Sequence, residues 1–181
     1  MQKLHVATLG LIASVVAIAG AAWMASAAPP PQEMSRPVID VGVVVSDLDR
    51  SMQFYQDVVG MTPVRGFDLD ADFGERSGLT DARPVRIEGL KLEDSEHATE
   101  WKLMSFGDAT PPDKGHIHDD LGMQYITIRV DDIDPYLERI RAHDVALLGE
   151  TPIALDDGNH FALIQDPDGT FIEFIGPMDG E

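Results

Sequence analysis

Seven polar or ionisable side chains recur at alternate positions of short apolar segments, where they could bind a small molecule and act on it. They are Asp40, Glu100, Lys102, Tyr125, Thr127, Arg129 and Glu173. A carboxylate can hold a cation or move a proton, and lysine and arginine can pair with charge on a ligand or with these same acids. This chemistry requires the seven side chains to be close in space, although they are far apart in the sequence.

Four segments with period-two alternation are predicted to position them. Residues 38–45, 100–106, 125–130 and 171–175 each set an apolar face against a more polar one, and the polar faces carry the seven residues. The apolar faces are expected to pack against helices. If the four strands form one curved sheet, the polar faces converge in a concave pocket, which is the best candidate site in the chain.

An internal repeat supplies the elements around these strands. Residues 40–50 and 125–135 each contain a β-branched run, an acidic helix cap and the start of a helix with an apolar stripe. Asp47 is predicted to cap the first helix, which ends at Gly60, and Asp132 is predicted to cap the second. A duplication of this length indicates two similar units that share one core.

The N-terminal residues are interpreted as an export signal. Residues 1–27 combine Lys3, a long apolar run and a small-x-small motif ending at Ala27, which is typical of a cleaved signal peptide. Residues 28–37 form a Pro-rich leader, and residues 38–177 form one folded domain. We therefore expect a periplasmic or secreted protein with no stable membrane association after cleavage. The alternative is an uncleaved N-terminal membrane anchor.

Charge and cysteine content exclude several classes of function. The chain carries 32 acidic against 13 basic side chains, a formal net charge of −19 at pH 7. Nucleic acids and anionic membrane surfaces require basic patches, so neither is an expected partner. The chain contains no cysteine, so no disulfide supports the fold.

Two further segments bear on the pocket. Asp166-Pro-Asp-Gly169 is a strong turn signal. With a bulge at this turn, Phe161 and Leu163 face the pocket and His160 faces away from it. His116 and His118, one residue apart, resemble a metal-binding pair, but their position between the two repeats favours a solvated loop.

At this point the chain resembles a known superfamily. The motifs V-S-D-L-D-R-S, F-Y and V-V-G-M in the first half and D-P-D-G-T-F-I-E-F in the second are similar to those of the vicinal oxygen chelate superfamily. Its members include glyoxalase I, extradiol dioxygenases and the bleomycin- and fosfomycin-resistance proteins. The resemblance implies an α+β fold of paired βαβββ modules, about 38–108 and 122–177, that form an incomplete barrel enclosing a ligand cup.

The resemblance also implies a set of candidate metal ligands and catalytic acids. The family's ligand positions fall on Asp40, Glu100, Tyr125 and Glu173, with Glu100 and Glu173 in the place of its glutamates. Asp40 and Tyr125 stand where metal-binding members usually carry histidine. The carboxylates of Asp40, Glu100 and Glu173 would suit an oxygen-preferring metal such as Mn or Mg better than Zn.

Three functional hypotheses remain open. The first is a metal-dependent lyase or dioxygenase-like enzyme in which Glu100 and Glu173 are catalytic. The second is a metal-free protein that binds or sequesters a small molecule, with Lys102 and Arg129 neutralising the acids of the pocket. The third is an interaction domain with an inert cup. In the first two cases the ligand would contact Tyr125, Thr127, Arg129, Lys102, Phe161 and Leu163. Family members often form homodimers, and the paired modules allow one here.

Overall fold

The computed structural model describes residues 34–107, 110–111 and 115–178. The predicted signal peptide, residues 1–27, and most of the leader therefore lie outside the described residues. Arg36–Glu181 form one compact unit, whose described part is considered below. Within the described ranges, no helix is both long enough and apolar enough to cross a membrane.

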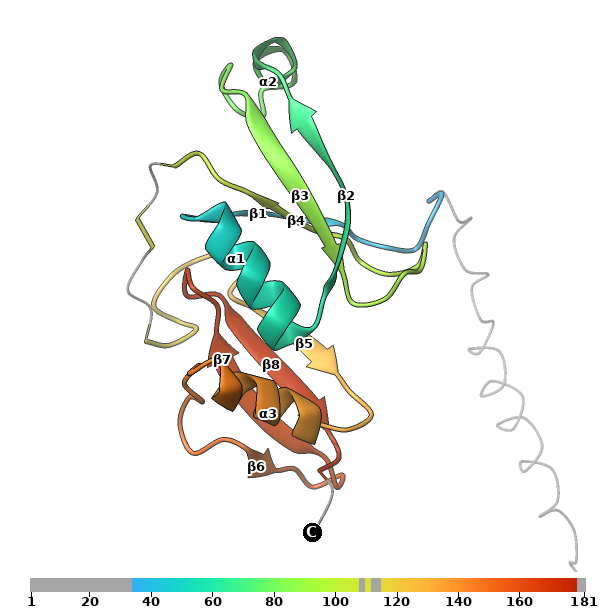
Figure 1. Ribbon diagram of the computed structural model, residues 1–181, viewed down its shortest axis with the longest axis vertical. Helices are drawn as coiled ribbons and strands as arrows, with labels where there is room; N and C mark the ends of the chain where they lie inside the picture. The colour runs from blue at the N-terminus through green and yellow to red at the C-terminus, as the bar shows by residue number, and fades with distance from the viewer. Residues whose placement is uncertain (1–33, 108–109, 112–114, 179–181) are drawn as a thin grey trace, which may run out of the picture. The chain divides into compact units, whose positions relative to one another are not determined.

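The domain is built from two modules that share one strand order (Figure 1). The first contains β1 (Val41–Val44), α1 (Leu48–Phe54), η1 (Tyr55–Val59), β2 (Thr62–Leu69), α2 (Ala71–Ser77), β3 (Val85–Lys91) and β4 (Trp101–Met104). The second contains β5 (Tyr125–Arg129), α3 (Asp134–Ala142), β6 (Ile153–Ala154), β7 (His160–Gln165) and β8 (Phe171–Gly176). The sheet orders are β1-β4-β3-β2 and β5-β8-β7-β6, and in each sheet the first strand pairs in parallel with the last. The predicted paired βαβββ architecture is confirmed.

The predicted cap of the first helix is present, whereas that of the second is not: the N-cap of α3 is Ile133, whose side chain makes no capping hydrogen bond. The Asp47 side chain accepts a hydrogen bond from the Arg50 N–H at 3.0 Å and so caps α1. This helix continues into the π-helical segment η1 and ends at Gly60, whose φ of 87° lies in the left-handed region. Asp132 accepts from the Asp134 N–H at 2.9 Å, and α3 proper begins two residues after Asp132.

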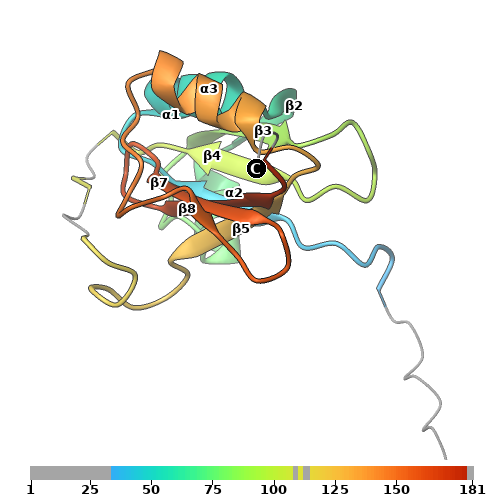
Figure 2. The ribbon, with the colours of Figure 1, turned by 90° about the horizontal axis from the view of Figure 1, so that it is seen from below.

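Alternation divides each sheet into a covered and an open face, as the sequence predicts. Trp101 and Leu103 of β4 are buried, whereas Lys102 between them is partly exposed. In β5, Ile128 is buried, whereas Tyr125 is exposed. Figures 1 and 2 show α1 and α3 on the same side of the two sheets, over the buried faces. The two modules thus share one core beneath the helices and leave the polar strand faces open.

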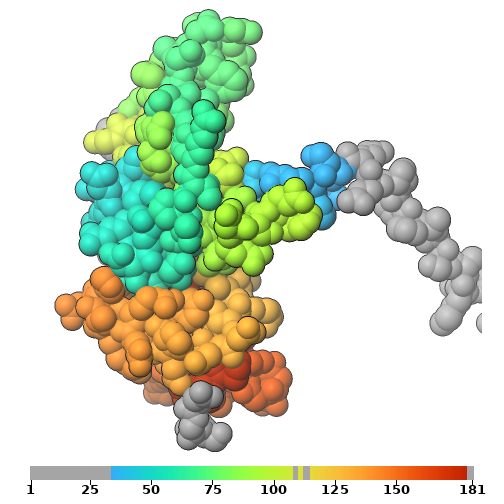
Figure 3. All heavy atoms as spheres, turned by 45° about the vertical axis from the view of Figure 1, so that its right-hand side comes forward, coloured from blue at the N-terminus to red at the C-terminus, as the bar shows by residue number. Residues whose placement is uncertain are grey.

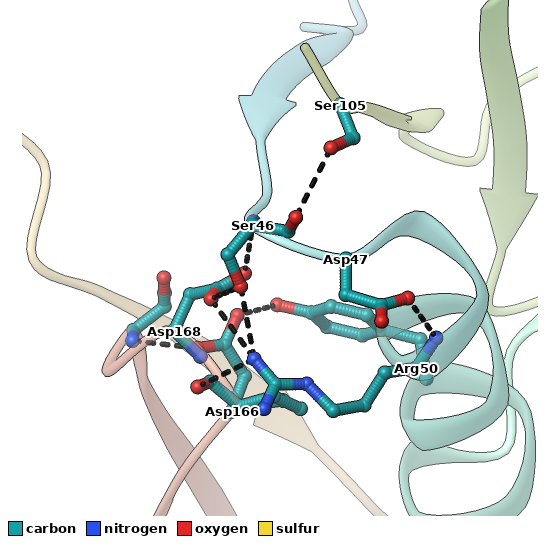
Figure 4. A network of polar contacts seen from close by, with 9 residues as sticks. Ser46, Asp47, Arg50, Ser105, Asp166 and Asp168 are labelled. Atoms are coloured by element: carbon teal, nitrogen blue, oxygen red, sulfur yellow. Dashed lines mark hydrogen bonds and ion pairs between the residues drawn. The ribbon is translucent and has the colours of Figure 1, made fainter. Parts of the chain in front are cut away.

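The β7–β8 turn of the second module is fastened to the first module by buried and half-buried polar contacts (Figure 4). The Tyr55 hydroxyl donates to Asp166 Oδ2 at 2.8 Å. Asp168 accepts from the Ser46 N–H at 3.0 Å and from the Ser46 hydroxyl, and it forms an ion pair with Arg50 at 3.3 Å. We call this set of residues, Ser46, Arg50, Tyr55, Asp166 and Asp168, the turn lock.

Burial sets the electrostatics of the turn lock. Burial, followed by the charge and hydrogen bond of Asp166, raises the pKa of Tyr55 well above its ordinary value. Burial likewise raises the pKa of Asp166, although hydrogen bonds from the Thr170 N–H and the Tyr55 hydroxyl oppose it. The hydroxyl therefore stays protonated and donates to the carboxylate.

Figure 3 shows the two modules, cyan to lime and orange to red, packed directly against each other.

Candidate functional site

The open face of the first module carries an acid that the chain itself neutralises. Asp40 immediately precedes β1, and its Oδ2 lies 3.3 Å from Lys102 Nζ and 3.2 Å from Arg36. Its Oδ1 accepts from the Glu100 N–H at 3.3 Å. Burial raises the pKa of Asp40, but the Glu100 N–H and Lys102 more than offset it, so the net shift is downward. Asp40 is thus an ionised carboxylate with two cationic partners.

Strand pairing shows which residue of the first module corresponds to Glu173. In the second module, Thr127 of β5 lies opposite Glu173 of β8. The repeat aligns Thr127 with Gly42, and Gly42 lies opposite Lys102. Lys102, and not Glu100 as the sequence motif implied, therefore occupies the strand position that matches Glu173. The first module places an ammonium group where the second places a carboxylate.

Glu100 lies one residue before β4, on the same face as Lys102. Its carboxylate passes over Gly89 of β3, because a Cβ added at Gly89 would lie 2.8 Å from Glu100 Oε1. Gly89 is opposite Lys102 in the sheet. Glu100, Lys102 and Asp40 therefore do gather on one face, as predicted, but within the first module only.

The open face of the second module is centred on Glu173. The Thr127 hydroxyl donates to Glu173 Oε2 at 2.5 Å, and Leu163 of β7 lies opposite Glu173 on its other side. Tyr125 and Arg129 share this face at the two ends of β5, and both are exposed. Tyr125, Thr127, Arg129 and Glu173 thus lie on one sheet face. The expectation of one curved sheet is wrong, because the four strands belong to two sheets and the seven residues are divided between them.

A cavity of about 750 Å³ lies over this second face. Its floor contains Phe161, Leu163, Phe171 and Glu173, and its rim is formed by residues 115–118 and 148–151 together with Ile153. Phe161 and Leu163 face the cavity and His160 faces the core, which is the orientation the turn predicts. We call this cavity the cup.

Sequence reasoning missed the position of His116 and His118 relative to the cup. Both imidazoles are exposed, as expected of a solvated loop, yet they stack at 5.4 Å on the rim of the cup. The closeness of residues 115–118 to β7 and β8 is a tertiary contact, and no local pattern in the sequence indicates it.

A second hollow of about 450 Å³ lies between the modules and is lined mostly by residues of the packed strand faces, together with Thr127 of the open face. It is bordered by Val41, Trp101, Ile126 and Ile128, whose side chains alternate with the open-face residues. These side chains belong to the packed faces, and the hollow is smaller than the cup. The cup is the better candidate for a ligand site.

The candidate metal ligands do not come together in the described part of the chain. Asp40 and Glu100 lie on the first sheet and Glu173 on the second, and no group of three or more His, Asp or Glu among the described residues is placed to hold a metal ion. Chemistry points the same way, because Lys102 and Arg36 already neutralise Asp40, and a divalent ion beside them would be repelled. The residues of the first module therefore do not fit a divalent metal centre.

Comparison with known proteins places this fold in a family. The family model for the glyoxalase/bleomycin resistance protein/dioxygenase superfamily matches residues 38–174. The chain belongs to this superfamily. A lactoylglutathione lyase of Haemophilus influenzae is 32% identical over 134 residues, which cover 72% of this chain and 85% of the lyase.

Solved structures of the superfamily share the fold. A glyoxalase family protein from Bacillus cereus superimposes with a TM-score of 0.66 at 19% identity, covering 83% of this chain and 99% of that protein. The trypanothione-dependent glyoxalase I of Leishmania major gives a TM-score of 0.53 at 24% identity, covering 78% of this chain and 87% of that enzyme. At these identities the likeness concerns the paired βαβββ fold of the superfamily alone.

Proposed function

We propose that this superfamily member binds a small molecule in the cup of its second module and does so without a divalent metal. The cup itself is the observation that carries the proposal, because a hollow of about 750 Å³ with an apolar wall and one inward carboxylate has the character of a ligand site. Independence from metal is supported by Lys102, which stands at the position that matches Glu173 and pairs with Asp40.

Filling the cup tests the proposal. Leu163→Trp extends a large side chain into the hollow from β7, and Leu79→Trp changes an exposed leucine that lies outside the cup. We expect the neutral probe 2-(1-naphthyl)ethanol to bind the full chain in the presence of a chelator, as followed by naphthyl fluorescence. Leu163→Trp should abolish this binding and Leu79→Trp should leave it unchanged. Equal binding by both variants would place the probe elsewhere on the molecule.

Metal titration completes the test. Calorimetry with Mn, Mg, Ca, Zn and Ni is expected to show no one-to-one binding to the wild-type protein at concentrations up to about 1 mM, a weak-binding limit. Glu173→Gln should give the same result as wild type. One metal ion bound per chain in the wild type and lost in Glu173→Gln would instead support a metal-dependent enzyme.

A lyase is the second candidate, favoured by the 32% identity to a lactoylglutathione lyase. In that role Glu173 would transfer a proton on the substrate, and Glu100 would be the second catalytic acid. The adduct of methylglyoxal and glutathione is the substrate to assay, with and without added Mn, Ni or Zn. Turnover that disappears in Glu173→Gln would establish this candidate in place of the first.

Export and self-association form part of the proposal. We propose that residues 1–27 direct export and are removed, so that N-terminal sequencing of exported protein should begin at Ala28. A homodimer is also proposed, supported by the exposed apolar side chains of Val44, Leu121 and Met123. Light scattering that gives only a monomer at high micromolar concentration would contradict the dimer.

A further inference from the structure

We infer that the cup takes a ligand with an apolar body and a positively charged nitrogen, such as an ammonium, amidinium or guanidinium group. This inference rests on the proposed function and specifies its ligand. The apolar part follows from the wall, where Phe161, Leu163 and Phe171 line the floor and Leu148 and Ile153 stand at the side. Burying the body of such a ligand against these side chains supplies most of the binding free energy.

The charged part follows from the acids of the cup. Glu173 lies at the floor and Glu150 at the rim, and none of the described residues that line the cup is lysine or arginine. Glu173 accepts from the Thr127 hydroxyl, which orients the carboxylate but brings no positive charge. Among the described residues, neither Glu173 nor Glu150 forms an ion pair. Within the described part of the chain, the lining of the cup therefore contains two negative charges without a cationic partner.

Three other partly buried acids of the domain do have a cationic partner. Asp40 pairs with Lys102 and Arg36, Glu88 pairs with Arg86 at 2.7 Å, and Asp168 pairs with Arg50. A half-buried carboxylate without a cation is the group that gains most from a cationic ligand, because each charge lowers the cost of desolvating the other.

An anionic ligand fits the same cup poorly. Its charge would lie close to Glu173 and Glu150, and like charges repel each other. No lysine or arginine in the described lining of the cup would compensate for this repulsion. The aromatic faces of Phe161 and Phe171 also favour a cation over an anion, since the ring face carries negative charge. Among ligands that share the same apolar body, the affinity is therefore expected to decrease from the cation to the neutral molecule to the anion.

Three probes with one apolar group measure this ordering. We would titrate the full chain with 2-(1-naphthyl)ethylammonium, 2-(1-naphthyl)ethanol and 1-naphthylacetate at pH 7 and low salt, following naphthyl fluorescence. The ammonium is expected to bind at least about tenfold more tightly than the acetate, with the alcohol between them. Added NaCl should weaken the binding of the ammonium and leave the binding of the alcohol nearly unchanged.

Variants then assign the preference to the cup. Glu173→Gln keeps the shape of the side chain. It should lower the affinity for the ammonium by about tenfold and change the affinity for the alcohol by less than about twofold. Glu150→Gln should give a smaller loss of the same kind, because Glu150 is exposed. Glu138→Gln is the matched control, since it removes the same charge from an exposed position on α3, outside the cup.

The outcomes separate this inference from the proposed function. If the acetate binds as tightly as the ammonium, or if the preference for the ammonium survives in Glu173→Gln and Glu150→Gln alike, the inference is overturned and the cup remains a ligand site. If none of the three probes binds, both the inference and the proposed function fail. A preference for the ammonium that is lost in Glu173→Gln and kept in Glu138→Gln supports both.

Discussion

Removing the Tyr55 hydroxyl isolates the central hydrogen bond of the turn lock. Tyr55→Phe keeps the ring, which is fully buried and packs against Phe54 and Trp101, and deletes only the donor that lies 2.8 Å from Asp166 Oδ2. A hydrogen bond to a charged group contributes about 1.5–3 kcal/mol. We expect a loss of about 2 kcal/mol in the free energy of unfolding at pH 7, which corresponds to a fall in Tm of about 4–8 °C for a domain of this size.

The pH dependence of this loss has a definite sign. Burial raises the pKa of Asp166 in the folded protein, and the Tyr55 hydroxyl opposes that rise by stabilising the carboxylate. A carboxyl group whose pKa is higher in the folded than in the unfolded protein stabilises the fold below its unfolded pKa, and this stabilisation is lost as the pH rises through its folded pKa. Without the hydroxyl the folded pKa of Asp166 rises further, so more of the free energy of unfolding is lost between acid and neutral pH. The cost of Tyr55→Phe should therefore be greater at pH 7 than near pH 3.8, where an aspartate in an unfolded chain titrates.

Urea unfolding followed by circular dichroism at both pH values measures the effect. Tyr136→Phe is the matched control, because no described residue makes a hydrogen bond to its hydroxyl and its ring packs against Phe174. The reasoning would be refuted by a loss below about 0.5 kcal/mol at pH 7, within the range of an ordinary surface substitution. A loss that grows toward acid pH would refute the assigned role of Asp166.

Two further predictions concern the first module and the end of β8 in the second. Lys102→Met removes a cation that lowers the pKa of Asp40. Asp40 stabilises the fold above its unfolded pKa, and this contribution is lost as the pH falls through its folded pKa. The contribution should be smaller in Lys102→Met. Because the pair is partly exposed, the change should stay below about 1 kcal/mol in urea unfolding between pH 7 and acid; a pH profile identical to wild type would contradict the assignment. Gly176→Ala would drive its Cβ into the Val130 carbonyl, a backbone atom, and should cost about 1–3 kcal/mol by thermal unfolding. Gly42→Ala, whose Cβ would meet only the flexible end of a side chain, should cost clearly less, and equal costs would count against the steric argument.

The strands that can be assigned from the sequence are those with uninterrupted alternation. β1, β5 and β8 are rich in β-branched or aromatic residues and contain no proline, so their open and covered faces follow from period two alone. β2 escapes such assignment, because Pro63 and Gly66 interrupt its pattern and its register shifts near that glycine. β6 contains two residues and is held by its pairing with β7, a contact that local pattern does not express.

The candidate site could be predicted as far as strand faces, and no further. Glu100 and Lys102 are two positions apart and share a face, so alternation gives both the same orientation and cannot say which one lies opposite β1 at the matching place. The pairing between β1 and β4 shows that Lys102 is the residue at this place, and these two strands are far apart in the sequence. For the same reason the approach of His116 and His118 to the cup had no sequence signal.

The turn lock also has a consequence for the order in which the domain can fold. Ser46 and Asp168 are 122 residues apart in the chain, and Tyr55 and Asp166 are 111 apart. Contacts of such length close late, because the entropy of a long loop must be lost before they form. The first module is therefore complete in sequence well before its central tyrosine can find the carboxylate that accepts its hydrogen bond. The buried hydroxyl of the first module therefore stays without this partner until the β7–β8 turn has been synthesised.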